Sequence, residues 1–196
     1  QEMIIGIKNI KNTQILFYDT PGSNFLKNSN NQSKKLKQNL WNGIDESDLI
    51  LYIIDSHKVN MHFLYDQIDK IKEVNKKIFI VFNKIDLISK TKLLPIISEI
   101  NNKFEIESFF TLSAKNNIGI DELLTELIKY SYSSKWIYSK DEITNKDDKF
   151  ILSELLRETI LTYLHKEIPY NISILTSHYK ILKNSEIKIK QKIYIN

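Results

Sequence analysis

Three short polar motifs carry the residue types in this sequence that could bind a ligand. The first is Asp19-Thr20-Pro21-Gly22, followed by Ser23. A carboxylate such as that of Asp19 can hold a Mg²⁺-bound water, because Mg²⁺ prefers hard oxygen ligands and keeps several of its waters. Gly22 offers a backbone N–H with no Cβ beside it, which suits close approach to a terminal phosphate. Taken alone, this motif is better interpreted as an ordinary turn, because Asp, Pro and Gly all favour turns.

The second motif, Asn83-Lys84-Ile85-Asp86, is more specific. The carboxylate of Asp86 can accept hydrogen bonds from both N–H donors on the Watson–Crick edge of guanine, where adenine presents an acceptor and a C–H. A site built on such bonds can reject the wrong base by about 10⁴–10⁵-fold. In this interpretation Asn83 braces the neighbouring loops and the stem of Lys84 lies along the plane of the base. The alternative is a solvated loop, since chance matches to three fixed positions occur in roughly a few per cent of chains.

The third motif, Ser113-Ala114-Lys115, is weak by itself because Ser-Ala pairs are common. The backbone N–H of Ala114 could donate to the carbonyl oxygen of guanine. The order of the three motifs gives this interpretation its weight, since each motif directly follows a predicted strand.

The elements around the motifs predict an α/β fold. Two β-rich runs over 2–8 and 13–18 predict a hairpin, and residues 23–34 predict a loop. Apolar strands over 49–54, 78–82 and 109–112 then alternate with helices over 61–74, about 91–103 and 119–130. This alternation predicts a parallel, doubly wound sheet with both faces covered. Ligands of such sheets bind beyond the carboxyl ends of the strands, so we expect the three motifs to meet there.

The remaining residues predict a second, smaller unit. Residues 131–149 are polar and predict a linker, in which Trp136 is expected to be a packing anchor. A helix over 150–165 precedes alternating strands over 171–179 and 187–195. The helix is expected to turn six apolar residues inward, namely Leu152, Leu155, Leu156, Ile160, Leu161 and Leu164.

Composition adds only weak constraints. The 196 residues include no Cys, which excludes disulfides and thiolate chemistry, and they contain no apolar run of the roughly 18–20 residues that a membrane span needs. The formal net charge of +4 hints at an anionic partner such as RNA. We discount that hint, because Arg157 is the only arginine and a lysine-rich skew is typical of AT-rich codon usage.

The three motifs match the third, fourth and fifth guanine-nucleotide motifs of translation-factor-class GTPases. The stretch from Trp136 onward resembles the junction and first KH-domain helix of Era-type GTPases, most specifically at Glu167-Ile168-Pro169-Tyr170. The resemblance covers essentially the whole chain. It implies a GTPase domain of the P-loop-NTPase type over 1–130, a linker over 131–149 and a partial, α+β KH-like RNA-binding domain over 150–196.

The resemblance also implies a function, which is binding and hydrolysis of GTP coupled to small-subunit rRNA binding in ribosome assembly. Asp19 would hold Mg²⁺ through water and Gly22 would sense the γ-phosphate, which makes these two the expected catalytic residues. The residues expected at the GTP or GDP are Asp19, Thr20, Pro21, Gly22, Ser23, Asn83, Lys84, Ile85, Asp86, Ser113, Ala114 and Lys115. The expected partner is the 30S subunit, bound by a monomer in the cytoplasm; a peripheral contact with the inner face of the cell membrane is left open.

The sequence departs from the family pattern in several places. It has no glycine-rich phosphate loop with Gly-Lys-Ser or Gly-Lys-Thr and no switch-I threonine. It also ends before a Gly-x-x-Gly loop, and Ser23 stands where Era-like proteins usually carry an apolar residue. We interpret the missing motifs as truncations at both ends, and expect weak nucleotide binding without useful hydrolysis.

Two other interpretations stay open. One is a non-catalytic remnant of such a GTPase, which would fit a base pocket without a phosphate cradle. The other is a different Era-like ribosome-assembly GTPase, although the single GTPase domain and the Ile168-Pro169-Tyr170 ending argue against a tandem-GTPase factor.

Overall fold

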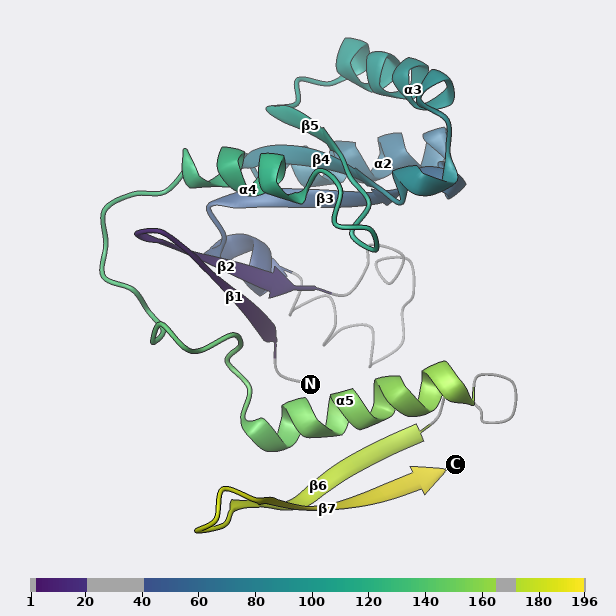
Figure 1. Cartoon of the computed structure of the whole chain (residues 1–196). Coiled ribbons are helices and arrows are strands. Elements are labelled where there is room, and N and C mark those ends of the chain that lie inside the picture. The colour runs from purple at the N-terminus through teal and green to yellow at the C-terminus, as the bar shows by residue number, and fades with distance from the viewer. Residues whose placement is uncertain (1–2, 21–40, 165–171, 196) are drawn as a thin grey trace. The chain divides into compact units, whose positions relative to one another are not determined.

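The computed structural model describes residues 3–20, 41–164 and 172–195 (Figure 1). The chain divides into two units. The first contains Gln1–Met3 and Asn9–Ile137, and the second contains Ile4–Lys8 and Tyr138–Asn196. Within the described residues, no helix is long and apolar enough to cross a membrane.

Three parallel strands form the sheet of the first unit, in the order β3-β4-β5 (Figure 1). They are β3 (Leu49–Asp55), β4 (Lys77–Asn83) and β5 (Ser108–Thr111). Asp55 lies opposite Asn83 in the register of β3 and β4. The predicted parallel sheet is therefore confirmed for these strands, and their carboxyl ends share one edge.

Helices cover both faces of this sheet, as the sequence predicts. They are α2 (Met61–Lys72), α3 (Lys90–Lys103) and α4 (Ile120–Ile128). Residues 41–46 are also helical. Each helix arises from apolar residues at helical spacing, and Asn60 caps the start of α2 by accepting a hydrogen bond from the Phe63 N–H at 3.0 Å.

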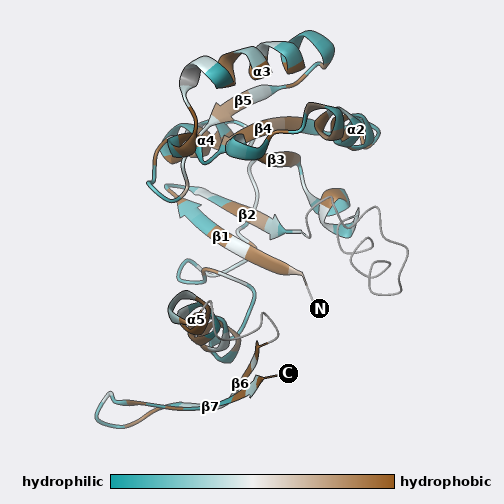
Figure 2. Cartoon of the chain, turned by 90° about the vertical axis from the view of Figure 1, so that its right-hand side faces the viewer, coloured by the Kyte–Doolittle hydropathy of each residue, from teal (hydrophilic) through white to brown (hydrophobic). Residues whose placement is uncertain are grey.

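Strand β4 separates two hydrophobic cores. Ile78, Ile80 and Phe82 pack with α2 and α3 on one face of the sheet. Phe79 and Val81 pack with α4 on the other face. All five side chains are buried, and the brown strands in Figure 2 show this apolar centre. The continuous apolar run follows from burial on both faces, because successive side chains of a strand point to opposite sides.

The predicted hairpin is confirmed by β1 (Ile4–Ile10) and β2 (Thr13–Asp19), which form a two-stranded sheet of their own. At its turn Lys11 adopts a left-handed conformation with φ 53°. The side chain of Gln14 donates to Asn9 Oδ1 at 3.1 Å beside this turn.

Residues of the predicted linker hydrogen-bond to this N-terminal region. In the first unit, the Trp136 indole N–H donates to the Asn12 carbonyl at 3.2 Å, so Trp136 anchors the segment as expected. In the second unit, the Ile7 N–H donates to the Ile143 carbonyl at 2.9 Å. The expected boundaries at 131 and 149 remain a prediction.

The second unit is built on one helix and one antiparallel hairpin. They are α5 (Asp148–Tyr163), β6 (Ile172–Ile181) and β7 (Ile187–Ile195), and α5 lies along one face of the hairpin (Figure 1). The Asp147 side chain caps α5 by accepting from the Phe150 N–H at 2.9 Å. The register shifts between Thr176 and His178, which marks a β-bulge.

A small polar cluster joins α5 to the hairpin. Ser153 Oγ accepts from the Thr176 N–H at 3.1 Å and lies 2.7 Å from Thr176 Oγ1. The side chain of Gln191 donates to Thr176 Oγ1 at 3.0 Å and to the Leu152 carbonyl at 2.9 Å. Only Ser153 of α5 is buried, and the expected inward stripe is wrong at Leu155, which is 53% exposed, and at Leu164, which is 40% exposed.

We predict that Ser153→Ala destabilises the second unit, because it leaves the buried Thr176 N–H without its acceptor. The expected loss is about 1–3 kcal/mol in the free energy of unfolding, measured by urea denaturation. Thr159→Ala is the matched control on the same helix, since this exposed hydroxyl donates only to the Leu155 carbonyl. Equal stabilities of the two variants would contradict the structural role of Ser153.

Candidate functional site

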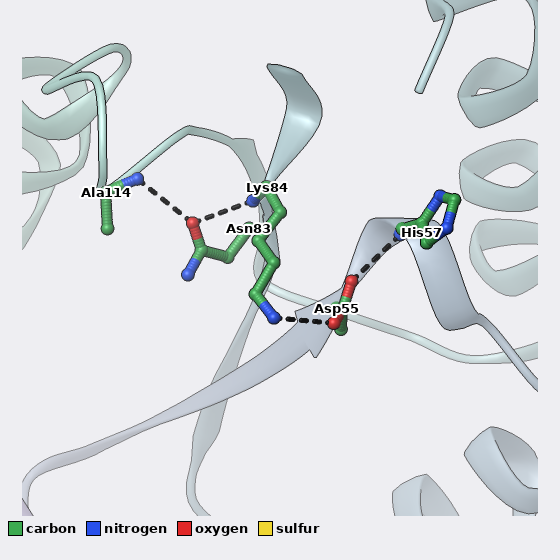
Figure 3. Close-up of polar contacts among 5 residues, drawn as sticks. All are labelled: Asp55, His57, Asn83, Lys84 and Ala114. Atoms are coloured by element: carbon green, nitrogen blue, oxygen red, sulfur yellow. Dashed lines mark hydrogen bonds and ion pairs between the residues drawn. The ribbon is translucent and has the colours of Figure 1, made fainter. Parts of the chain in front are cut away.

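The second and third motifs meet at the carboxyl edge of the parallel sheet. Asn83 ends β4, and Ala114 lies just beyond the neighbouring strand β5. Asn83 Oδ1 accepts from the Lys84 N–H at 2.7 Å and from the Ala114 N–H at 3.0 Å (Figure 3). The expected bracing role of Asn83 thus has a geometric basis, because one side-chain oxygen holds both loops.

Backbone hydrogen bonds reinforce this junction. The Leu112 N–H donates to the Phe82 carbonyl at 2.9 Å, and the Ile85 N–H donates to the Leu112 carbonyl at 3.2 Å. Gly119 closes the third-motif loop with φ 75°, and a Cβ there would lie 2.5 Å from the Thr111 carbonyl oxygen. A side chain at this position is therefore excluded by both conformation and space.

Asp86 is held by Ser113, a buried residue of the third motif. Ser113 Oγ donates to Asp86 Oδ1 at 2.5 Å and accepts from the Asn116 N–H at 3.3 Å. Between the described residues, no hydrogen bond uses the other Asp86 oxygen, Oδ2. The carboxylate is thus oriented while keeping acceptor capacity for a ligand, since each oxygen has two lone pairs.

Lys84 adopts an unusual backbone conformation at the same edge. Its φ of 64° and ψ of 38° are left-handed, and it precedes the short 3₁₀ helix η3 (Ile85–Leu87). Such a conformation is uncommon for a residue with a side chain and clusters at functional sites. Lys84 Nζ contacts Asp55 Oδ2 at 2.7 Å, so the side chain is directed towards the end of β3 (Figure 3).

Asp55 is a site residue that sequence reasoning missed. It is the last residue of β3, and its Oδ1 accepts from the His57 N–H at 3.0 Å at the start of the 3₁₀ helix η2 (Ser56–Lys58). The hydrogen bond from Lys84 is the main cause that lowers the pKa of the Asp55 carboxyl below its usual range. The sequence does contain a signal that could have identified Asp55, because it is a carboxylate at the end of a continuous apolar strand. Asp19 is singled out in the first motif on the same kind of signal.

The first motif is only partly described. Asp19 ends β2 as an exposed residue and Thr20 follows it, whereas Pro21, Gly22 and Ser23 lie outside the described residues. No hydrogen bond between described residues joins Asp19 or Thr20 to the other two motifs. Those residues also contain no group of three His, Asp or Glu that could hold a metal ion. Binding of Mg²⁺ through Asp19 therefore stays a prediction, as do the nucleotide contacts of the exposed Lys115.

A cavity of about 540 Å³ lies elsewhere in the first unit. It is lined by residues 12–18, by β3 residues such as Leu49 and Leu51, and by the segment around Trp136. None of its lining residues belongs to the three motifs, so the hydrogen-bonded edge at Asn83 is the stronger candidate site.

Comparison with known proteins identifies the family of the first unit. Residues 5–133 match the family described as the Elongation factor Tu GTP binding domain. The chain belongs to this GTP-binding domain family. The expected resemblance to Era-type GTPases is also confirmed. GTPase Era of Rickettsia conorii is 32% identical over 196 residues, and GTPase Era of Agrobacterium fabrum is 30% identical over 190 residues.

Solved structures show the same relationship. Era in complex with MgGDPNP and nucleotides 1506–1542 of 16S ribosomal RNA matches with a TM-score of 0.80 and 27% identity, over 99% of this chain. A single-residue variant of Aquifex aeolicus Era bound to GDP·AlF₄⁻ matches with a TM-score of 0.81 and 27% identity, over 98% of this chain.

The chain spans only part of these relatives. The match includes 100% of this chain but 57% of the R. conorii protein, and 97% of this chain but 59% of the A. fabrum protein. The chain covers 66% of each of the two solved chains.

We predict that Asn83→Ala loosens the junction between the two motifs, because the Lys84 and Ala114 N–H groups lose their shared acceptor. Amide hydrogen exchange, followed by NMR, should become faster at both positions. Asn83→Asp is the matched control, since it keeps an acceptor oxygen of the same shape and should retain slow exchange. Unchanged exchange at Ala114 in the Ala variant would contradict the bracing role.

We also predict that Lys84→Met raises the pKa of the Asp55 carboxyl towards its usual range. Because the folded pKa is lowered, the pair contributes stability above the unfolded pKa and loses it as pH falls through the folded pKa. Carbon-13 NMR of the carboxyl groups measures the shift. Lys70→Met is the control: it breaks an exposed pair with Asp66 and should leave the Asp55 titration unchanged.

Proposed function

We propose that this chain is the base-reading part of an Era-type GTP-binding protein, which couples GTP binding and hydrolysis to binding of small-subunit rRNA in ribosome assembly. The observation that carries the proposal is the joint geometry of Asn83, Asp86 and Ser113 at the sheet edge. The Era relatives support it, because one is bound to MgGDPNP and 16S rRNA and another to GDP·AlF₄⁻.

Guanine fits the chemistry of this edge. Its N1–H and 2-amino group are donors, and the Asp86 carboxylate, held by Ser113, is an acceptor. The aliphatic stem of Lys84 would cover one side of the base, with its ammonium group kept near Asp55. The Asn83 bracing keeps both loops in place without using the base-reading carboxylate.

For the phosphates and Mg²⁺ we propose Asp19 acting through water, with Gly22 at the γ-phosphate and Thr20, Pro21 and Ser23 beside them. A lone carboxylate suits Mg²⁺, which retains several waters and needs few protein ligands. The 196 residues contain no Gly-Lys-Ser or Gly-Lys-Thr. We therefore propose that these residues alone bind guanine nucleotides weakly and hydrolyse GTP too slowly to measure above background.

For the second unit we propose a partial KH-like fold that contacts rRNA and the 30S subunit. The helix α5 followed by the β6–β7 hairpin is the support for it, together with the Era–rRNA relative. We propose a monomer that works in the cytoplasm, with peripheral contact at the inner face of the cell membrane as a secondary location.

We predict that Asp86→Asn reverses the base preference from guanine to xanthine. The Asn amide would donate to the xanthine C2 carbonyl and face the guanine amino group donor-to-donor. The expected loss for GDP is about 10–100-fold, equivalent to one hydrogen bond to a charged group, with a gain for XDP. Nitrogen-15 NMR titrations of the 196-residue chain measure this even at millimolar affinity.

The matched control is Asp69→Asn, which changes an exposed carboxylate on α2 and should leave the preference for GDP intact. ADP should compete poorly with GDP for the wild-type chain. Equal chemical-shift changes with ADP and GDP around Asp86 would refute guanine recognition at this edge.

A further inference from the structure

The net charge of this chain is concentrated on the β6–β7 hairpin. Residues 172–195 contain five lysines and one glutamate, Glu186, which gives a formal charge of +4 with His178 neutral. The whole chain also has a formal net charge of +4. The other residues are therefore balanced between acids and bases, so a lysine-rich composition does not explain the charge of the hairpin.

Four of these lysines lie on the face of the hairpin that points away from α5. Thr176 and Gln191 are register partners, and both hydrogen-bond on the α5 side. Strand side chains alternate, so the positions next to Gln191 in β7 face the opposite way. The residues of this lysine face are Lys180, Lys188, Lys190 and Lys192.

Like charges on the lysine face repel each other. Lys180 lies directly opposite Lys188 across the hairpin. Like charges placed opposite each other destabilise a strand pair, with Cβ atoms about 4.5–5.5 Å apart. All four lysines are exposed, and none forms an ion pair with another described residue. A bound anion would offset this repulsion.

The spacing suits a linear polyanion. Lys188, Lys190 and Lys192 occupy alternate positions of one strand, which places them about 6.6–6.8 Å apart. Tyr194 continues the same row and is 47% exposed. Single-stranded nucleic acids are bound by such combinations of a basic track with an aromatic ring on which a base stacks.

We propose that the lysine face binds the phosphate backbone of single-stranded RNA, with a base stacked on Tyr194. RNA is favoured over an anionic lipid surface because the charges form a row that ends in an aromatic ring, and Leu175 is the one large aliphatic side chain on this face. This proposal names a surface of the second unit that would contact RNA. It rests on the proposed function only in taking RNA as the partner.

The test is fluorescence anisotropy of a short labelled single-stranded RNA, titrated with the 196-residue chain over a range of KCl concentrations. Replacement of the four lysines by Gln should weaken binding at low salt by about tenfold or more. The slope of log K against log [KCl] should fall in magnitude by about 3, since each phosphate contact on a single strand contributes about 0.7. Tyr194→Ala should weaken binding without changing this slope.

Two matched variants separate position from total charge. Replacing the four lysines by Arg keeps the charge and should preserve binding and slope. Replacing Lys72, Lys92, Lys135 and Lys149 by Gln removes the same charge from exposed positions elsewhere and should leave the slope close to wild type. If circular dichroism shows that the quadruple Gln variant is unfolded, the paired variants K180Q/K188Q and K190Q/K192Q give half the effect each.

The outcomes distinguish this inference from the proposed function. Equal binding by wild type and the lysine-face Gln variant would overturn the inference while leaving RNA binding intact. Undetectable RNA binding by wild type would overturn both the inference and the RNA part of the proposed function. Binding to phosphatidylserine vesicles but not to RNA would overturn it in favour of a membrane surface.

Discussion

Strand β4 is the constraint on which the first unit depends, because it supplies both hydrophobic cores and the candidate site. Its alternating side chains are buried on both faces of the sheet. The helices α2 and α3 pack against one of these faces, and α4 packs against the other. Burial also fixes its register between β3 and β5, since a slip by one residue would exchange the two faces. Its last residue, Asn83, is thereby placed between Asp55 and Ala114, where a single amide oxygen can join two loops.

The candidate site is a set of polar side chains held by hydrogen bonds at the carboxyl edge of the parallel sheet. Ser113 orients the carboxylate of Asp86, and Asp55 holds the ammonium group of Lys84. These supporting contacts leave acceptor capacity at Asp86, which is what recognition of guanine requires. The family assignment and the Era relatives agree with this chemistry, and the chain spans 57–66% of the length of these relatives.

The second unit follows a different principle. Its helix and hairpin meet around Ser153, Thr176 and Gln191, so hydrogen bonds specify how α5 lies on the sheet. A small unit with few buried apolar residues depends strongly on such contacts, because each unpaired buried group costs free energy. The opposite face of the hairpin carries exposed lysines, and a bound polyanion would offset the repulsion between them.

The sequence alone determined the kinds of element and drew attention to the motifs at Asn83 and Ser113, because apolar periodicity and strand-ending polar residues are local signals. It predicted β3, β4 and β5 nearly to the residue, but it misplaced Leu155 on the inner side of α5. Only the tertiary structure decided that Asp55 holds Lys84 and that Ser113 holds Asp86. These pairs are distant in sequence and depend on which strands are neighbours, a choice made by burial on both faces of β4.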